Sequence, residues 1–189
     1  MKRKMLTIGM AFLALLMVAG PASAEMEPGV AGETQATIMT ACMIAVAVAG
    51  ISSAIGLVLA GNSAVAVTAE KPELFGRTLV LQVLPMTQAV YGLLAAILLM
   101  MGAGLLGGTA AVDLTNPSLG MGAIWIGLIV GLTGISAIGQ GMVASSSIAA
   151  VGRNPDVAAR GIIFTVMPET IAIFGLLVAI LLMTGLSLL

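Results

Sequence analysis

Residues 92–100 read GLLAAILLM, and residues 175–183 read GLLVAILLM, 83 residues further along the chain. The same offset aligns SAIG at residues 53–56 with SAIG at residues 136–139, and it matches one proline and one arginine in a short loop of each half. Of the 48 positions aligned in this way, 20 are identical. Two unrelated apolar helices share some residues by chance, but they do not share loop prolines and arginines. The chain is therefore predicted to contain one helical hairpin twice, in parallel orientation.

The composition is that of a membrane protein. Hydrophobic residues make up 60% of the 189 residues and charged residues 8%, whereas a soluble domain carries about a quarter charged residues. The uncharged runs are long enough to cross the ~30 Å hydrocarbon core of a bilayer. We expect an all-α membrane protein with four transmembrane helices in two tandem hairpins, at residues 36–106 and 118–188. The apolar stretches are residues 36–69, 78–106, 118–151 and 161–188.

The same composition excludes several classes of function. There is no histidine and Cys42 is the single cysteine, which excludes a disulfide within the chain and a His/Cys metal site. The few aromatic residues and the lack of a basic patch exclude nucleic-acid binding. No GxxxxGK[ST] segment is present, so no direct ATP binding by a P-loop is expected and the chain has no catalytic site of its own.

Residues 1–24 are predicted to be a signal peptide, with a basic start, an apolar middle and a small-residue cleavage site at Ala22-Ser23-Ala24. The alternative is an uncleaved fifth span. All basic residues after residue 24 fall in two short loops. The stretch before the first span and the loop that carries Asp113 contain acidic residues and no basic ones. The positive-inside rule then places both loops in the cytoplasm and both termini outside it, in a protein of the cell membrane. The loop bases are Lys71, Arg77, Arg153 and Arg160.

Glycine, alanine and serine are concentrated in two of the four stretches, residues 36–69 and 118–151. Small residues let helix backbones approach closely where lipid provides no hydrophobic drive. The other two stretches are bulkier. This contrast predicts two crowded inner helices and two outer helices facing lipid, in a ring of identical copies. Ordinary packing of a single four-helix bundle is the alternative.

Glu169 is the only acid inside a predicted span. A charge at mid-depth costs several kcal/mol unless it is paired or protonated, so an intramembrane carboxylate indicates a functional site. Its counterpart in the first hairpin is Met86. The two hairpins are therefore expected to share one charged site.

A polar stripe lies in the first hairpin, at positions i, i+3, i+4 and i+7 of one helix face. Pro85 has no N–H and leaves a backbone carbonyl about one turn earlier without its partner. On the third span, Gln140 stands where the first repeat has Leu57. Together with Glu169 these groups offer about five oxygens for a hard cation, and a single carboxylate favours Na⁺ over Ca²⁺ or Mg²⁺. Either glutamine taken alone also fits an interhelical hydrogen bond. The stripe consists of Leu84, Thr87, Gln88 and Tyr91.

These residues resemble the membrane rotor proteolipid, known as the K or c subunit, of V/A-type ATPases and ATP synthases. The resemblance runs from about residue 36 to the C-terminus. It is carried by the two fused hairpins, by Pro168-Glu169-Thr170, and by Leu-Pro-x-Thr-Gln followed by Tyr at residues 84–91. In sodium-pumping members a matching stripe binds Na⁺. The resemblance implies Tyr91 as a hydrogen-bond partner of the carboxylate and, as Na⁺ ligands, Leu84, Thr87, Gln88, Gln140 and Glu169.

The resemblance also implies a ring of identical copies that turns in the membrane lipid against a stator. Each Glu169 would take up a cation, cross the lipid neutralised, and release the cation when a stator arginine approaches. The arginines of this chain lie in loops or in the leader, so a partner subunit must supply that arginine, and ATP is hydrolysed or made in partner subunits. The cytoplasmic loops offer a docking surface for a central stalk, although solvated turns would look the same. The docking residues would be Lys71, Arg153, Asn154 and Asp156.

Two alternatives stay open from the sequence. The first keeps the rotor and makes H⁺ the coupling ion. The second is a small self-contained transporter or pore built from a duplicated hairpin. A purely structural membrane scaffold would leave Glu169 unexplained.

Overall fold

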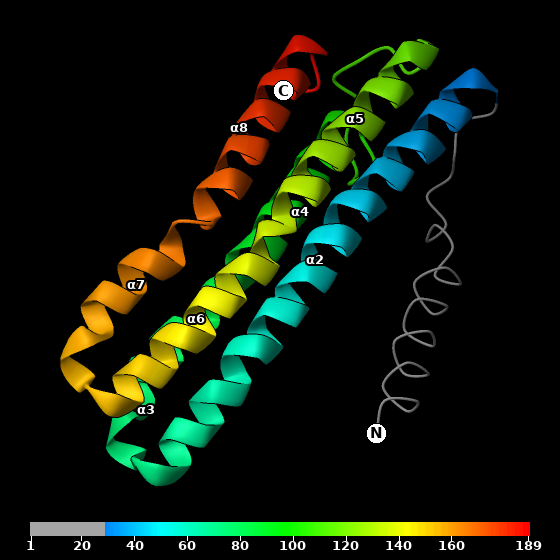
Figure 1. The fold of residues 1–189 in the computed structure, drawn as a ribbon. Coiled ribbons are helices and arrows are strands. Elements are labelled where there is room, and N and C mark those ends of the chain that lie inside the picture. The colour runs from blue at the N-terminus through cyan, green and yellow to red at the C-terminus, as the bar shows by residue number, and fades with distance from the viewer. Residues whose placement is uncertain (1–28) are drawn as a thin grey trace.

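The computed structural model describes residues 29–189, and the predicted signal peptide at residues 1–24 lies outside this part of the chain. The described residues form helices joined by short turns, with one longer loop between the two halves (Figure 1). Four helical stretches are long and apolar enough to cross a membrane. They confirm the predicted all-α class with four spans, and the chain is an integral membrane protein. The stretches are Val30–Glu70, Pro72–Gly102, Pro117–Arg153 and Pro155–Gly185.

The first hairpin begins with one continuous helix and returns as a broken one. Helix α2 (Val30–Glu70) ends where Pro72 opens the turn η1 (Pro72–Leu74). The returning stretch is divided because Pro85 has no N–H for the helical ladder, and a 3₁₀ turn replaces the α-helix there. Its parts are α3 (Phe75–Val83), η2 (Leu84–Met86) and α4 (Thr87–Gly102).

The second hairpin repeats this plan with one addition. Its inner helix is divided at Ile135, whereas α2 is continuous. The turn between the inner and outer helices again starts at a proline, and Pro168 again breaks the outer helix at mid-length. The parts are α5 (Pro117–Gly134), α6 (Ser136–Arg153), η3 (Pro155–Val157), α7 (Ala158–Val166) and α8 (Glu169–Gly185).

The inner helices pack through glycine. Helix α2 lies against both α5 and α6, and it also contacts α4. Gly127 sits against the carbonyl of Ala41, and Gly141 sits against the carbonyl of Gly56, so closely that a Cβ at either glycine would overlap the oxygen. This close contact follows from the small residues that the sequence concentrates in these two stretches.

The turns of both hairpins lie at the same end of the bundle (Figure 1). Lys71 Nζ donates to the carbonyl of Gly152 at 2.7 Å, and Arg77 Nη1 donates to the carbonyl of Pro155 at 2.7 Å. Each bond runs from the first hairpin to the second. Two of the four loop bases therefore tie the hairpins together at this end.

The long connection and the C-terminus lie at the opposite end of the bundle (Figure 1). In the connection, Asp113 Oδ1 accepts hydrogen bonds from the Thr115 N–H at 3.0 Å and from the Thr115 hydroxyl at 2.7 Å. These bonds favour the ionised carboxylate and lower the pKa of Asp113. Asn116 then caps α5, since its side chain accepts from the Ser118 N–H.

Candidate ion-binding site

Glu169 lies near the middle of the span Pro155–Gly185, at the first position of α8. The break at Pro168 separates α7 from α8 just before it and so sets where the side chain emerges. The side chain of Glu169 is only 8% exposed. The sequence thus places one acid at mid-span, and the fold buries it.

Both oxygens of this carboxylate accept hydrogen bonds. Tyr91 Oη donates to Glu169 Oε1 at 2.8 Å, and Gln140 Nε2 donates to Glu169 Oε2 at 3.3 Å. Tyr91 comes from α4 and Gln140 from α6, so three helices meet at the carboxylate. Gln140 is fully buried.

The remaining residues of the predicted site form a chain of hydrogen bonds that begins at Gln140. Gln88 Nε2 donates to Gln140 Oε1 at 2.7 Å. The hydroxyl of Thr87 lies 3.3 Å from Gln88 Oε1 and 3.0 Å from the carbonyl oxygen of Leu84, and it can donate to either. All six residues that the sequence singled out therefore lie in one connected polar cluster.

Ser53 also contacts the helix that carries the site, and it was not among the residues predicted from the sequence. Its hydroxyl, on α2, accepts the backbone N–H of Ala89 at 3.0 Å, and Ser53 is 2% exposed. In a regular helix the N–H of Ala89 would point to the carbonyl of Pro85. The bond thus joins the first turn of α4 to the inner helix. The signal was present, since Ser53 is a serine within a span and belongs to the repeated SAIG segment.

No basic side chain hydrogen-bonds or ion-pairs with Glu169 in residues 29–189; its partners are a phenol and an amide. Within the same residues there is no group of three or more His, Cys, Asp and Glu that could hold a metal ion. The site therefore combines one carboxylate with several neutral oxygens. That donor set suits a single monovalent cation, because one carboxylate balances one positive charge.

The residues predicted to dock a central stalk lie at the turn end of the bundle. Lys71 is half-buried and is used in the bond to Gly152. Asn154 caps the turn η3, since its side chain accepts the N–H of Asp156 at 3.0 Å. Arg153 and Asp156 are exposed. Lys71 and Asn154 thus hold the turns in shape, and the charges of Arg153 and Asp156 face outward.

The fold and the site together define a class. Two membrane hairpins fused in one chain share one buried carboxylate at mid-span, which is the organisation of a duplicated membrane proteolipid. A family model described as the C subunit of ATP synthase matches this chain twice, at residues 40–99 and 124–182, once in each hairpin. The chain belongs to this family of ATP synthase C subunits.

Individual relatives agree with the family. The chain is 44% identical over 145 residues to the A-type ATP synthase subunit K of Methanocaldococcus jannaschii, covering 77% of this chain and 62% of that protein. It is 38% identical over 136 residues to the V-type sodium ATPase subunit K of Enterococcus hirae, covering 70% and 81%. It is 27% identical over 157 residues to the 16 kDa proteolipid of the V-type proton ATPase of Rattus norvegicus, covering 82% and 90%.

The chain thus spans somewhat less than two thirds of the Methanocaldococcus jannaschii relative and most of the other two. All three are proteolipid subunits of ATPases or ATP synthases, and none is a catalytic subunit. They confirm the predicted family, and they agree with the prediction that this chain carries no catalytic site.

Proposed function

We propose that this chain is the ion-carrying rotor subunit of a V/A-type rotary ATPase. It binds Na⁺ at Glu169 and moves it across the membrane, and partner subunits couple this movement to ATP hydrolysis or synthesis. The observation that carries the proposal is the buried carboxylate at mid-span, bonded to Tyr91 and Gln140 and continued by a row of neutral oxygens. The similarity to a V-type sodium ATPase subunit K supports the same role.

The hydrogen bonds at Glu169 favour a cation as cargo. Both carboxylate oxygens lie within hydrogen-bond distance of a neutral group, the Tyr91 phenol or the Gln140 amide. Neutral donors orient the charge but do not cancel it, and an uncompensated charge at this depth costs several kcal/mol. A bound monovalent cation removes the net charge and lets the site face lipid at modest cost.

The neutral oxygens favour Na⁺ over H⁺. A proton needs only the carboxylate, and the oxygens of Leu84, Thr87 and Gln88 would have no role in binding it. A half-turn of the Gln140 amide exchanges its oxygen and nitrogen, so the same side chain can turn Oε1 toward a cation. With one carboxylate oxygen these groups supply five ligands of the type that hard cations prefer.

The proposed cycle uses copies of this chain in a ring. Each copy carries a neutralised Glu169 through the lipid and releases its cation when a stator arginine, supplied by a partner subunit, approaches. Each charge that crosses is worth ~2.3 kcal/mol per 100 mV, so several crossings are summed for one ATP. The turn end of the bundle, with Arg153 and Asp156, faces the cytoplasm and a central stalk, and both termini lie outside.

The sodium site is tested by competition for the carboxylate of Glu169. Carbodiimides modify the protonated acid, so bound Na⁺ slows the modification. The protection weakens as pH falls, because protons compete with Na⁺ for the same oxygens. Labelling is followed by mass spectrometry of the whole complex in native membranes, over a series of Na⁺ concentrations and pH values. Labelling that ignores Na⁺ at every pH would reject sodium and leave the proton-driven rotor standing.

A further inference from the structure

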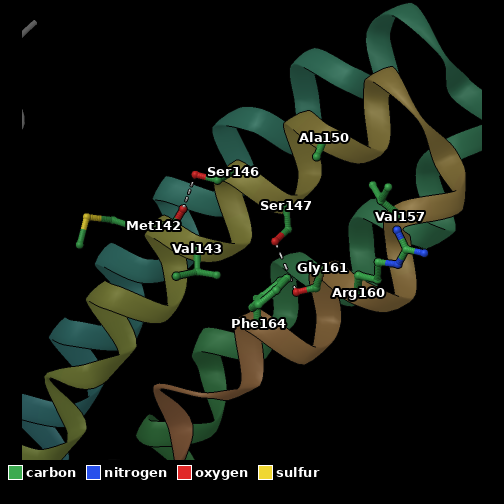
Figure 2. Close-up of a pocket in the computed structure, with 9 residues that line it drawn as sticks. All are labelled: Met142, Val143, Ser146, Ser147, Ala150, Val157, Arg160, Gly161 and Phe164. Carbon is green, nitrogen blue, oxygen red and sulfur yellow. Dashed lines mark hydrogen bonds between the residues drawn. The ribbon is translucent and has the colours of Figure 1, made fainter.

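The serine hydroxyls in the described helices have hydrogen-bond partners, with one exception. Ser146 and Ser147 line a groove of about 550 Å³ between α6 and α7. Figure 2 shows the Ser146 hydroxyl donating to the Met142 carbonyl at 3.2 Å and the Ser147 hydroxyl donating to the Gly161 carbonyl at 3.3 Å. The exception is Ser136, whose hydroxyl oxygen is buried and has no partner in residues 29–189. A buried polar atom of this kind requires an explanation.

The first reason for the unused hydroxyl is the break in the inner helix. A helical serine can donate to the carbonyl four residues earlier, as Ser52 donates to Val48 at 2.7 Å. The carbonyl four residues before Ser136 belongs to Leu132 of α5, and the helix is broken between them at Ile135. The Leu132 carbonyl accepts the N–H of Ile135 at 3.2 Å. The hydroxyl of Ser136 therefore makes no bond to the backbone of its own stretch.

The second reason is where the outer helices begin. The repeat counterpart Ser53 accepts the N–H of Ala89. That N–H precedes the helical ladder of α4, because the N-cap is Met86 and the first bonded N–H comes four residues after the N-cap. In the second hairpin the N-cap is Pro168, so the ladder of α8 already includes the N–H of Ala172, the counterpart of Ala89. The hydroxyl in the second hairpin thus has no backbone N–H to accept.

Gln140 has an unused donor close to this hydroxyl. It lies four residues after Ser136, so the two side chains share one face of α6. Helical side chains lean toward the N-terminus, and the amide of Gln140 therefore extends over the turn that holds Ser136. The amide nitrogen carries two N–H groups, and among the described residues it makes one hydrogen bond, to Glu169 Oε2 at 3.3 Å. Gln140 is 0% exposed, so its second N–H is buried too.

We propose that Ser136 is a positioning residue of the sodium site, whose hydroxyl accepts a hydrogen bond from Gln140 Nε2. The inference rests on the proposed function and states how the amide is held when Na⁺ is bound. Gln140 presents Oε1 to the cation by a half-turn of its amide, which moves Nε2 away from the carboxylate. The displaced N–H groups are buried and need an acceptor, and Ser136 supplies it from the same helix. The hydroxyl thus holds the amide in the orientation that binds Na⁺.

Ser136→Ala tests this role in the carbodiimide assay of Glu169, in the whole complex in native membranes. The substitution removes the hydroxyl and keeps the rest of the side chain. We expect the Na⁺ concentration that gives half-protection to rise about 3- to 10-fold, the equivalent of one neutral hydrogen bond. Labelling without Na⁺ should keep the pH profile of the wild type, because the Ser136 hydroxyl makes no bond to the carboxylate.

Gln140→Leu shows whether Ser136 acts through the amide. If it does, Ser136→Ala should have no further effect in a chain that already carries Gln140→Leu. A hydroxyl that contacted the cation itself, or that only stabilised the fold, would shift protection by the same factor in both backgrounds. Ser52→Ala is the matched control, because Ser52 is a buried serine of α2 that is bonded within its own helix. It should leave the protecting Na⁺ concentration at the wild-type value.

The outcomes separate this inference from the proposed function. If Na⁺ protects the wild type and protects the Ser136→Ala variant equally well, the inference is wrong and the proposed function stands. Equal shifts with and without Gln140, or an altered pH profile in the absence of Na⁺, would also overturn the positioning role alone. If Na⁺ does not protect Glu169 of the wild type, the proposed sodium site fails and the inference fails with it.

Discussion

Glu169 and Met86 occupy equivalent positions of the repeat. The groups that surround Glu169 are polar, whereas their repeat counterparts are apolar. Around Glu169 the structure gathers a phenol and two amides. The repeat counterparts of these three groups are all apolar. One chain therefore offers one site for two hairpins. The counterparts of Tyr91, Gln88 and Gln140 are Phe174, Ile171 and Leu57.

This asymmetry predicts one ion per chain. Glu169→Gln should abolish ion transport coupled to ATP hydrolysis, because the only carboxylate in the middle of a described span is lost. Met86→Leu, which changes the equivalent position without touching a charge, should retain coupled transport. ATP-driven ²²Na⁺ uptake into vesicles containing the whole complex measures both. Uptake that persists in the Glu169 variant would remove this residue from the transport cycle.

Each neutral oxygen of the site should contribute to affinity. Thr87→Val, Gln88→Leu and Gln140→Leu each remove one contact to the cation. A hydrogen-bond-like contact to a charged group is worth ~1.5–3 kcal/mol, which corresponds to about one to two decades in the Na⁺ concentration that protects Glu169 from carbodiimide. Reactivity at low Na⁺ should remain, because the carboxylate is still present.

Thr170→Val is the matched control for Thr87→Val. Thr170 is the repeat counterpart of Thr87, and its hydroxyl donates to the Met167 carbonyl at 2.8 Å, much as the Thr87 hydroxyl meets the Leu84 carbonyl at 3.0 Å. Thr170 is exposed and stands outside the cluster. If the protecting Na⁺ concentration rises equally in the two variants, the hydroxyl of Thr87 is not a sodium ligand.

At the scale of elements, the two hairpins have the same order of helices, but the outer helix packs on the inner helix differently in each. Ser53 accepts the Ala89 N–H, whereas its counterpart Ser136 has a buried hydroxyl without a hydrogen-bond partner among residues 29–189. Gly92 lies against Ala45 and Ala49, whose counterparts are Leu128 and Leu132, whereas Gly175 lies against the side chain of Thr133. Helix α8 thus sits differently on its inner helix, and it contacts α4 as well. This placement brings its first residue, the glutamate, to the side chains of α4.

The contact between inner helices makes a prediction at this scale. Gly141→Ala places a methyl group against the Gly56 carbonyl, and overpacking of this kind costs about 1–3 kcal/mol. Gly50→Ala is the matched control, because Gly50 is a helical glycine of α2 with nothing within 4 Å of the added Cβ. Both changes gain the same helix propensity, about 0.5–1 kcal/mol.

Thermal unfolding of the purified protein in detergent measures the difference. The Tm of the Gly141 variant should fall clearly below that of the Gly50 variant, which should match or exceed the wild type. Equal Tm values would show that α2 and α6 do not approach as closely as described.

At the scale of the whole molecule, the two ends of the bundle carry different chemistry. The turn end holds all the basic residues of the described chain, and the other end holds the long connection and the C-terminus (Figure 1). Gly76 lies in the first turn of α3 and Gly108 lies in the long connection, and both are exposed. Cysteines at these two positions should label from opposite sides of the membrane in a Cys42→Ser background. Gly76 should label from the cytoplasm, by the positive-inside rule.

An impermeant maleimide applied to intact cells and to inverted vesicles gives the sides directly. Labelling of both positions from one side would contradict the four-span topology. The same purified protein, reconstituted without partner subunits, should show no Na⁺ or H⁺ flux, because the half-channels belong to a stator. Flux from the chain alone would favour the self-contained transporter instead.

Features that are local, or that repeat along the chain, could be predicted from the amino-acid sequence. The length of the apolar runs predicts four spans, prolines predict the turns and the mid-span breaks, and the repeat predicts two hairpins with a single acid, Glu169. Helical spacing alone places Leu84, Thr87, Gln88 and Tyr91 on one face, because the period of a helix is independent of its neighbours.

Features that depend on the rotation and register of one helix against another required the folded chain. Only packing brings Tyr91 to one oxygen of Glu169 and Gln140 to the other. Packing also places the Ser53 hydroxyl at the backbone N–H of Ala89, and the Lys71 ammonium at the carbonyl of Gly152 in the other hairpin. It also leaves the groove between α6 and α7 open. These relations are set by contacts between residues far apart in the chain, such as Gly56 with Gly141, and neither composition nor periodicity encodes the distance and rotation at which two such helices meet.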